Sequence, residues 1–197
     1  MAYSKYTLEE VEQVFSLGEK TESLFDNVQG ISPTGWLLET LQKAQFMPTK
    51  SEKARSELII TPILLTIAEM NKETITIFSG ENLEADIEKG LNGECDYILS
   101  RNPKSFSLKA PIFGLVEAKQ NIVENSMGQC AAQMLGAQIF NQKRGNNITK
   151  IYGCVSNGDV WQFLKLVQNE LSIDTKKCYI DNLSELLGVL QYIINDK

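Results

Sequence analysis

The sequence predicts a single α/β domain with a central mixed sheet and helices on both faces, a three-layer α/β/α sandwich. Segments with α-helical periodicity alternate along the chain with short apolar or β-branched segments, which is the pattern of this fold class. The chain has 197 residues, of which 43% are hydrophobic and 22% charged, an ordinary composition for a globular protein. We find no internal repeat, low-complexity tract or linker, so we expect residues 1–197 to form one domain.

The helices are predicted from capping residues and from apolar residues spaced three or four apart. Thr7 and Glu10 form a capping box that opens the first helix, and Asn182 caps the last helix, whose leucines and isoleucines share one face. Pro62 should kink or break a long central helix, because its ring clashes with the preceding turn. The expected helices are 7–17, 34–45, 51–70, 125–142 and 182–195.

The strands are predicted from β-branched alternation and from short apolar runs. The first strand should end at the Ser79-Gly80 pair, and the Asn157-Gly158 pair should form a hairpin turn. The apolar run at 111–119 is expected to be a central strand that is buried on both faces. The expected strands are 74–78, 93–100, 111–119, 149–156, 160–166 and 171–173.

The complete absence of histidine limits the chemistry open to the chain. It excludes Ser-His-Asp and Cys-His catalysis, HNH-type nucleases and zincins. Any catalysis must therefore use carboxylates, lysine, a cysteine alone or a metal. The four cysteines are widely spaced and form no Cys-x-x-Cys pair, which disfavours a zinc site and indicates reduced, mostly buried thiols.

The N-terminal segment has neither the basic nor the apolar part of a signal peptide, and no apolar run is long enough to span a membrane. We therefore expect a cytoplasmic protein with no membrane partner. The net charge of −6 argues against nonspecific binding of nucleic acid over the whole surface, but it leaves room for local basic patches. Candidate phosphate-contacting residues are Lys143, Arg144 and Lys150 after the fourth helix, and Lys53 and Arg55 in the third.

Acidic and basic side chains follow two of the predicted strands in a pattern that is typical of a metal site. If 93–100 and 111–119 are neighbours, Asp96 lies opposite Glu117, and Lys119 projects to the same side as Glu117 because strand residues two apart share a face. Two converging carboxylates are best tolerated around a hard divalent cation such as Mg²⁺. The backbone carbonyl of Ala118 is a further candidate ligand, and Lys119 would lie beside a metal-bound water.

The order and spacing of these residues resemble those of the PD-(D/E)XK nuclease superfamily, the restriction-endonuclease-like fold. The resemblance covers about residues 50–170 and matches Glu57 on the first core helix, Asp96 on the second strand, and Glu117 with Lys119 on the third. The family often carries a glutamine on the following helix, and both Gln129 and Gln133 qualify; they are four apart and share a helix face. The pattern departs from the family where Glu94-Cys95 replaces a proline before Asp96.

The resemblance implies a Mg²⁺-dependent nuclease that hydrolyses DNA phosphodiester bonds with metal-activated water, and in which Mn²⁺ can substitute for Mg²⁺. Asp96 and Glu117 would hold the metal, Lys119 would assist the nucleophile, and Glu57 would be an outer or second-metal ligand. A homodimer would supply two sites to cut both strands. Residues 1–48 lie outside the motifs as an N-terminal helical extension, and 182–195 form a C-terminal helix.

Two other functions remain open. The chain could be a catalytically inactive relative that keeps the nuclease fold as a nucleic-acid-binding or assembly module, which its acidic balance favours. It could also be a structural or regulatory α/β protein, in which the carboxylates point to solvent far from one another.

Overall fold

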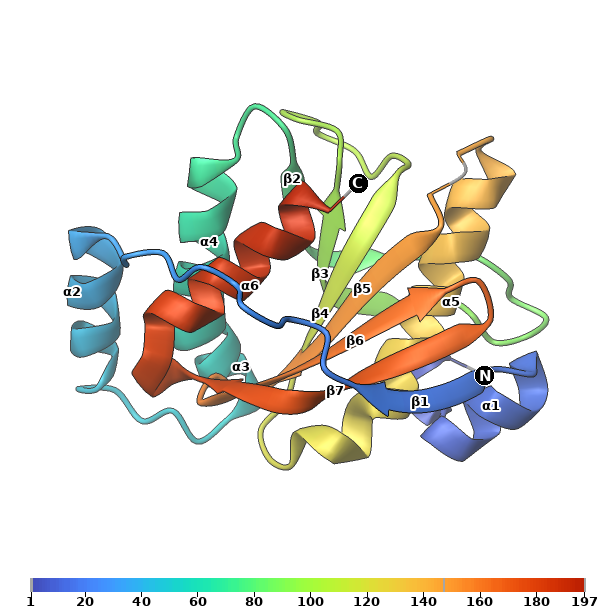
Figure 1. Cartoon of the computed structure of the whole chain (residues 1–197), viewed down its shortest axis with the longest axis horizontal. Coiled ribbons are helices and arrows are strands. Elements are labelled where there is room, and N and C mark those ends of the chain that lie inside the picture. The colour runs from blue at the N-terminus through green and yellow to red at the C-terminus, as the bar shows by residue number, and fades with distance from the viewer. Residues whose placement is uncertain (1, 147, 197) are drawn as a thin grey trace.

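A seven-stranded mixed sheet runs through the centre of the protein, as the computed structural model in Figure 1 shows for residues 2–146 and 148–196. Its strand order is β1-β7-β6-β5-β4-β3-β2, with β1 parallel to β7, β4 parallel to β5, and every other pair antiparallel. The predicted α/β class with a mixed sheet is therefore confirmed. The strands are β1 (Gly18–Glu22), β2 (Thr76–Asn82), β3 (Glu94–Ser100), β4 (Ile112–Ala118), β5 (Lys150–Ser156), β6 (Val160–Val167) and β7 (Glu170–Tyr179).

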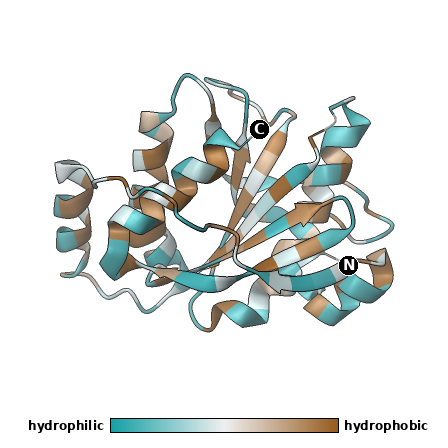
Figure 2. Ribbon diagram, viewed as in Figure 1, coloured by the Kyte–Doolittle hydropathy of each residue, from teal (hydrophilic) through white to brown (hydrophobic). Residues whose placement is uncertain are grey.

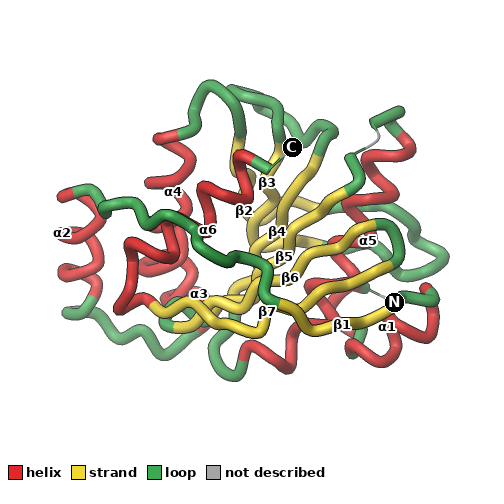
Figure 3. The backbone as a smooth tube through the Cα atoms, in the orientation of Figure 1, coloured by secondary structure: helices red, strands yellow, loops and turns green. Residues whose placement is uncertain are grey.

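Helices cover both faces of this sheet. On one face α5 packs against β4, β5 and β6, with α1 outside it; on the other face α4 and α6 contact each other and the sheet, and α2 packs against α4 (Figure 1). The long connection from β1 to α2 runs across α6, as the loop trace in Figure 3 shows. The helices are α1 (Leu8–Phe15), α2 (Gly35–Ala44), α3 (Glu52–Arg55), α4 (Thr61–Met70), α5 (Met127–Lys143) and α6 (Leu183–Asn195).

Strand β4 lies at the centre of the hydrophobic core, and all seven of its residues are buried. Ile112 and Leu115 belong to the apolar cluster on the α5 side, whereas Phe113 and Val116 belong to the cluster under α4 and α6. The central strands are accordingly among the most apolar segments in Figure 2. The prediction of a central strand buried on both faces is confirmed.

The long helix predicted at 51–70 is continuous but carries a π-helical turn. Residues Glu52–Arg55 are α-helical, Ser56–Ile60 form the π-helical turn, and Thr61–Met70 are α-helical again. Pro62 has no N–H and its ring crowds the carbonyl four residues earlier, so the preceding backbone widens to i→i+5 bonding. The proline thus distorts the helix as expected, by a widened turn and not by a break.

Three elements differ from their predicted form. The segment before residue 48 is more than a helical extension, because it supplies the edge strand β1. Strand β2 continues through the Ser79-Gly80 pair to Asn82, and β7 is far longer than the predicted 171–173. In the described part of the chain no helix combines the length and hydropathy of a membrane span, and all four cysteines are buried and free.

Candidate functional site

The predicted carboxylate pair comes together where β4 ends beside the start of β3. The two strands are antiparallel, and Tyr97 pairs with Val116, so Asp96 and Glu117, the next residue of each strand, lie at the same end of this strand pair. The backbone N–H of Ala118 donates a hydrogen bond of 2.8 Å to Oδ2 of Asp96. The structure therefore brings together the two acids that strand alternation predicted.

Glu117 is a buried carboxylate held by three donors. Its side chain is on the α5 face of the sheet and the residue is only 2% exposed. Lys119 Nζ donates to Oε1 at 2.6 Å, Gln133 Nε2 donates to Oε2 at 2.7 Å, and Gln129 Nε2 also donates to Oε1. Both candidate glutamines thus reach the same acid, because they are one helical turn apart on α5.

Small residues let α5 approach the sheet closely enough for these contacts. A Cβ added to Gly153 on β5 would lie 2.4 Å from Sδ of Met134 and 2.7 Å from Sγ of Cys130. A larger residue at this position would force the side chains of Met134 and Cys130 to move. Gly153 therefore contributes to the close packing of α5 on the sheet.

The electrostatics of Glu117 are unusual for a carboxylate. Burial, followed by repulsion from Asp96, raises the pKa of Glu117 to about 7, against the opposing effects of Lys119 and Gln133. Burial acts to lower the pKa of Lys119, but attraction to Glu117, Glu52 and Asp96 outweighs it, so the pKa of Lys119 is raised. Perturbed, coupled groups of this kind are enriched at functional sites.

Asp96 faces a surface cleft of about 280 Å³ next to the ion pair of Glu117 and Lys119. Carboxylates dominate the charged groups of this cleft: Glu52, Glu57, Glu94 and Asp96 line it, with Lys53. Ala118, whose carbonyl is a predicted metal ligand, lines the cleft too, and its N–H is bonded to Asp96. The cleft is thus a place where a cation could be held beside Asp96.

Glu57, predicted as an outer or second-metal ligand, lines this cleft. Its side chain is 62% exposed, and its Oε1 is 3.8 Å from Lys53 Nζ. Glu52, which the sequence analysis did not select, comes closer: its Oε2 is 3.9 Å from Lys119 Nζ. Lys119 therefore bridges a buried and a half-exposed carboxylate.

Tyr97 is a second residue that the sequence analysis missed. Its hydroxyl is 2.5 Å from Ser56 Oγ and 2.9 Å from Thr61 Oγ1, and it also donates to the Ser56 carbonyl at 3.2 Å. These bonds tie the π-helical turn to β3 directly beside Asp96. A helical distortion of this kind is frequent at functional sites, and Pro62 was the signal in the sequence that pointed to it.

The predicted basic patches lie in different parts of the molecule. Lys143 and Arg144 end α5, and Lys150 begins β5, at the opposite end of the sheet from Glu117. The 17 residues of α5 separate the two ends by about 25 Å. Lys150 also pairs with Asp196, and Arg55 pairs with Asp159 at 2.8 Å. Of the five predicted phosphate-contacting residues, all of which the structure describes, Lys53 alone lines the cleft.

The donor set fits a small hard cation better than a soft one. Asp96 and Glu117 supply oxygen ligands, and Mg²⁺ commonly takes one or two carboxylates and completes its shell with water and substrate phosphate. In the described residues no three His, Cys, Asp or Glu side chains are grouped for a metal as they stand. Glu117 would have to exchange its bonds to Lys119 and Gln129 to bind one.

Comparison with known proteins assigns the chain to no family. No protein-family model matches it, and no curated protein matches it. The site must therefore be interpreted from its own geometry.

Proposed function

We propose that the protein is a Mg²⁺-dependent nuclease of the restriction-endonuclease-like class that hydrolyses phosphodiester bonds in DNA. One observation carries the proposal: two carboxylates on adjacent strands, Asp96 and Glu117, meet beside an ammonium group that is 2.6 Å from Glu117. The order of these residues on β3 and β4, and the glutamines on the next helix, support the same class.

The chain's own residues have distinct roles in this proposal. Asp96 and Glu117 hold the cation, with Glu57 at the outer rim as an indirect or second-metal ligand. Bound Mg²⁺, or Mn²⁺ in its place, would polarise the scissile phosphate and activate a water for attack. Lys119 orients the attacking water and stabilises the negative charge that develops on the phosphate.

The glutamines position Glu117 in this proposal. Their amide groups hold the buried Glu117 carboxylate in one rotamer, so its orientation is fixed before any ligand binds. Lys119 and Gln129 donate to the same oxygen of Glu117, so Gln129 would still hold this oxygen if Lys119 turned its ammonium towards the substrate.

The first test is calorimetric titration of Mg²⁺ and Mn²⁺ into the wild type and into Asp96→Asn/Glu117→Gln. We expect binding in the wild type and none in the double variant, because both carboxylates become neutral amides of similar size. A cleavage screen with plasmid, linear and single-stranded DNA then follows on the same proteins. Lys143→Ala is the matched control, since it removes a lysine at the far end of α5. Absence of binding in the wild type, both with and without DNA, contradicts the nuclease proposal.

A second candidate function is a non-catalytic module that keeps the nuclease fold for binding or assembly. The carboxylates that line the cleft favour it, because Glu52, Glu57 and Glu94 would repel a phosphate backbone and only Lys53 opposes them. This function predicts no cleavage with either metal, together with a stable complex with a partner. A homodimer, in which two clefts act on the two DNA strands, belongs to the first proposal alone.

A further inference from the structure

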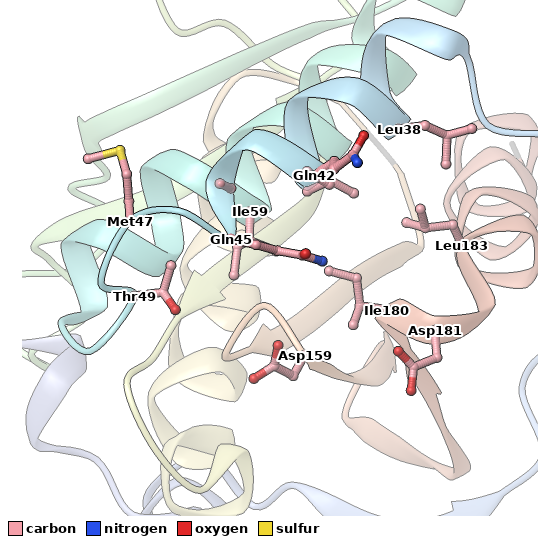
Figure 4. A pocket seen from close by; sticks show the side chains of 12 residues that line it. Leu38, Gln42, Gln45, Met47, Thr49, Ile59, Asp159, Ile180, Asp181 and Leu183 are labelled. Carbon is pink, nitrogen blue, oxygen red and sulfur yellow. The ribbon is translucent and has the colours of Figure 1, made fainter.

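A second, larger pocket lies between α2 and the start of α6. Its volume is about 560 Å³, within the range of ligand-binding pockets. One wall is a single face of α2, formed by Leu38, Leu41, Gln42 and Gln45, which follow an i, i+3, i+4, i+7 spacing. Ile180 and Leu183 form the opposite wall, and Figure 4 shows the side chain of Gln45 extending towards Ile180.

The apolar surface of this pocket continues onto the outside of the molecule. Leu38 is 49% exposed and Met47 is 55% exposed, although both line the pocket. Phe46, which lies between two lining residues in the sequence, is 86% exposed. Exposed aromatic and methionine side chains beside a groove are characteristic of surfaces that bind another polypeptide.

The negative charge of the pocket favours polypeptides that carry basic side chains. Among residues 2–146 and 148–196 no lysine or arginine lines it, whereas Asp159 and Asp181 do, and Figure 4 shows both carboxylates on the same side of Ile180. Oδ2 of Asp159 already accepts a bond from Arg55, so one guanidinium is accommodated at this end. Asp181 makes no ion pair with any residue of 2–146 or 148–196. A cationic group on a partner would therefore gain most at Asp181.

We propose that this pocket docks a basic, apolar polypeptide segment of a partner protein. The partner inserts an apolar side chain between α2 and α6 and places a lysine or arginine against Asp181. Nucleic acid is a poorer occupant, because its phosphates would meet two carboxylates. A second copy of this chain is also poorer, because each copy carries a net charge of −6. The proposal does not depend on the nuclease function.

The test is fluorescence anisotropy with a short labelled peptide that alternates leucine and lysine, and with a matched peptide that carries glutamate in place of each lysine. We expect the basic peptide alone to bind. Asp181→Asn should weaken it about fivefold, as expected for one lost charge pair at an interface. Leu38→Ser should weaken it about tenfold through lost apolar contact. Both substitutions are at exposed positions and should leave the fold intact.

Glu88→Gln is the matched control, because it removes one negative charge from an exposed loop outside the pocket. It should change the affinity less than about twofold, which separates docking at the pocket from general attraction to an acidic protein. Equal weakening by Asp181→Asn and Glu88→Gln, or binding of the acidic peptide, overturns the proposal. A dimer in sedimentation that Leu38→Ser dissociates would assign the pocket to a second copy instead. Duplex DNA binding that Leu38→Ser abolishes would assign it to nucleic acid.

Discussion

Two charged clusters lie at opposite ends of the same sheet, and they are built in opposite ways. At one end Glu117 and Glu52 lie 2.6 and 3.9 Å from the same lysine, Lys119, and a third acid, Asp96, is nearby. At the other end the single carboxylate of Asp196 receives bonds from Lys150 and, at 2.6 Å, from the Tyr152 hydroxyl. The first cluster has an excess of acid, whereas the second is balanced.

The two ends differ in what their charges do for the fold. Although burial acts to raise the pKa of Asp196, hydrogen bonds from Lys150 and Tyr152 lower it, so ionised Asp196 stabilises the folded chain. Arg101 completes this end by donating to the carbonyls of Ile194 and Asp196 at 2.7 and 2.6 Å, which closes the end of α6. Glu117 has a raised pKa, and its ionised form costs stability. Carboxylates with perturbed pKa values are enriched at functional sites.

The largest expected effect compares one lysine from each end. Lys119→Ala should lower metal-dependent DNA cleavage by at least about 10³-fold, because the variant loses a positive charge at the reacting phosphate. Lys150→Ala should leave the cleavage rate within about twofold, since Lys150 pairs with Asp196 at the opposite end of the sheet from Glu117. Single-turnover cleavage with saturating Mg²⁺ measures both. Similar rates in the two variants would contradict the assignment of the active end.

The pH dependence of stability should have opposite signs at the two ends. Below about pH 4.5 Glu117 is protonated in both the folded and the unfolded chain. As the pH rises towards 7, the unfolded chain releases this proton first. The free energy of unfolding therefore falls by up to roughly 3 kcal/mol over this range. Asp196 contributes stability above its unfolded pKa, about 4, and this contribution is lost as pH falls below that value. Urea unfolding from pH 3 to 8 in EDTA should show both trends.

The matching variants separate the two trends. Glu117→Gln should remove the decline between about pH 4.5 and 7, and Asp196→Asn should remove the loss below about pH 4. An unchanged profile in Glu117→Gln would mean that this carboxylate is ionised as easily as in the unfolded chain.

A smaller effect is expected at the balanced end when its arginine is removed. Arg101→Ala should lower the free energy of unfolding by about 2 kcal/mol, because two carbonyls at the end of α6 lose their donor and the guanidinium no longer stacks on Phe113 at 4.2 Å. Lys104→Ala, which breaks an exposed ion pair with Glu73, should cost less than about 0.5 kcal/mol. Equal urea midpoints for the two variants would rule out this role for Arg101.

The smallest effect concerns the outer rim of the acidic end. Glu57→Gln should weaken Mg²⁺ binding by only about twofold, because its side chain is 62% exposed and lies away from Glu117. Asp96→Asn should weaken it at least about tenfold. Calorimetry on the two variants compares them directly, and a tenfold loss in Glu57→Gln would make it a direct ligand.

The contacts of Glu117 with Lys119 and with the two glutamines follow from local patterns in the sequence, although the family resemblance selected the glutamines. Strand alternation placed Glu117 with Lys119, and helical spacing placed Gln129 with Gln133. Glu52 escaped detection because the π-helical turn changes the phase of its helix, so a regular helical spacing from Glu57 does not apply. The distance of Lys143 from the site was equally hidden, because the sequence does not say which end of a long helix faces the acids.

The least predictable part of the fold was the edge of the sheet. Strand β1 has the sequence Gly-Glu-Lys-Thr-Glu, which shows no apolar alternation, because four of its five residues are exposed. Charged edge strands of this kind resist pairing with other chains. Its place in the sheet comes from long-range pairing with β7, which no local pattern encodes.

The π-helical turn also changes the angle between two faces of one continuous helix. One is the face of α3 that points at the cleft, and the other is the face of α4 that packs in the core. Each α-helical residue advances the helix by about 100°, so the extra residue in Ser56–Ile60 turns everything before it by that angle relative to α4. Glu52, the acidic residue of α3, can therefore point into the cleft while Ile63 and Ile67 remain in the core. Deleting a single residue from this turn would leave the packing of α4 intact and rotate Glu52 away from Lys119. The number of residues in the turn therefore sets the direction in which the Glu52 side chain points.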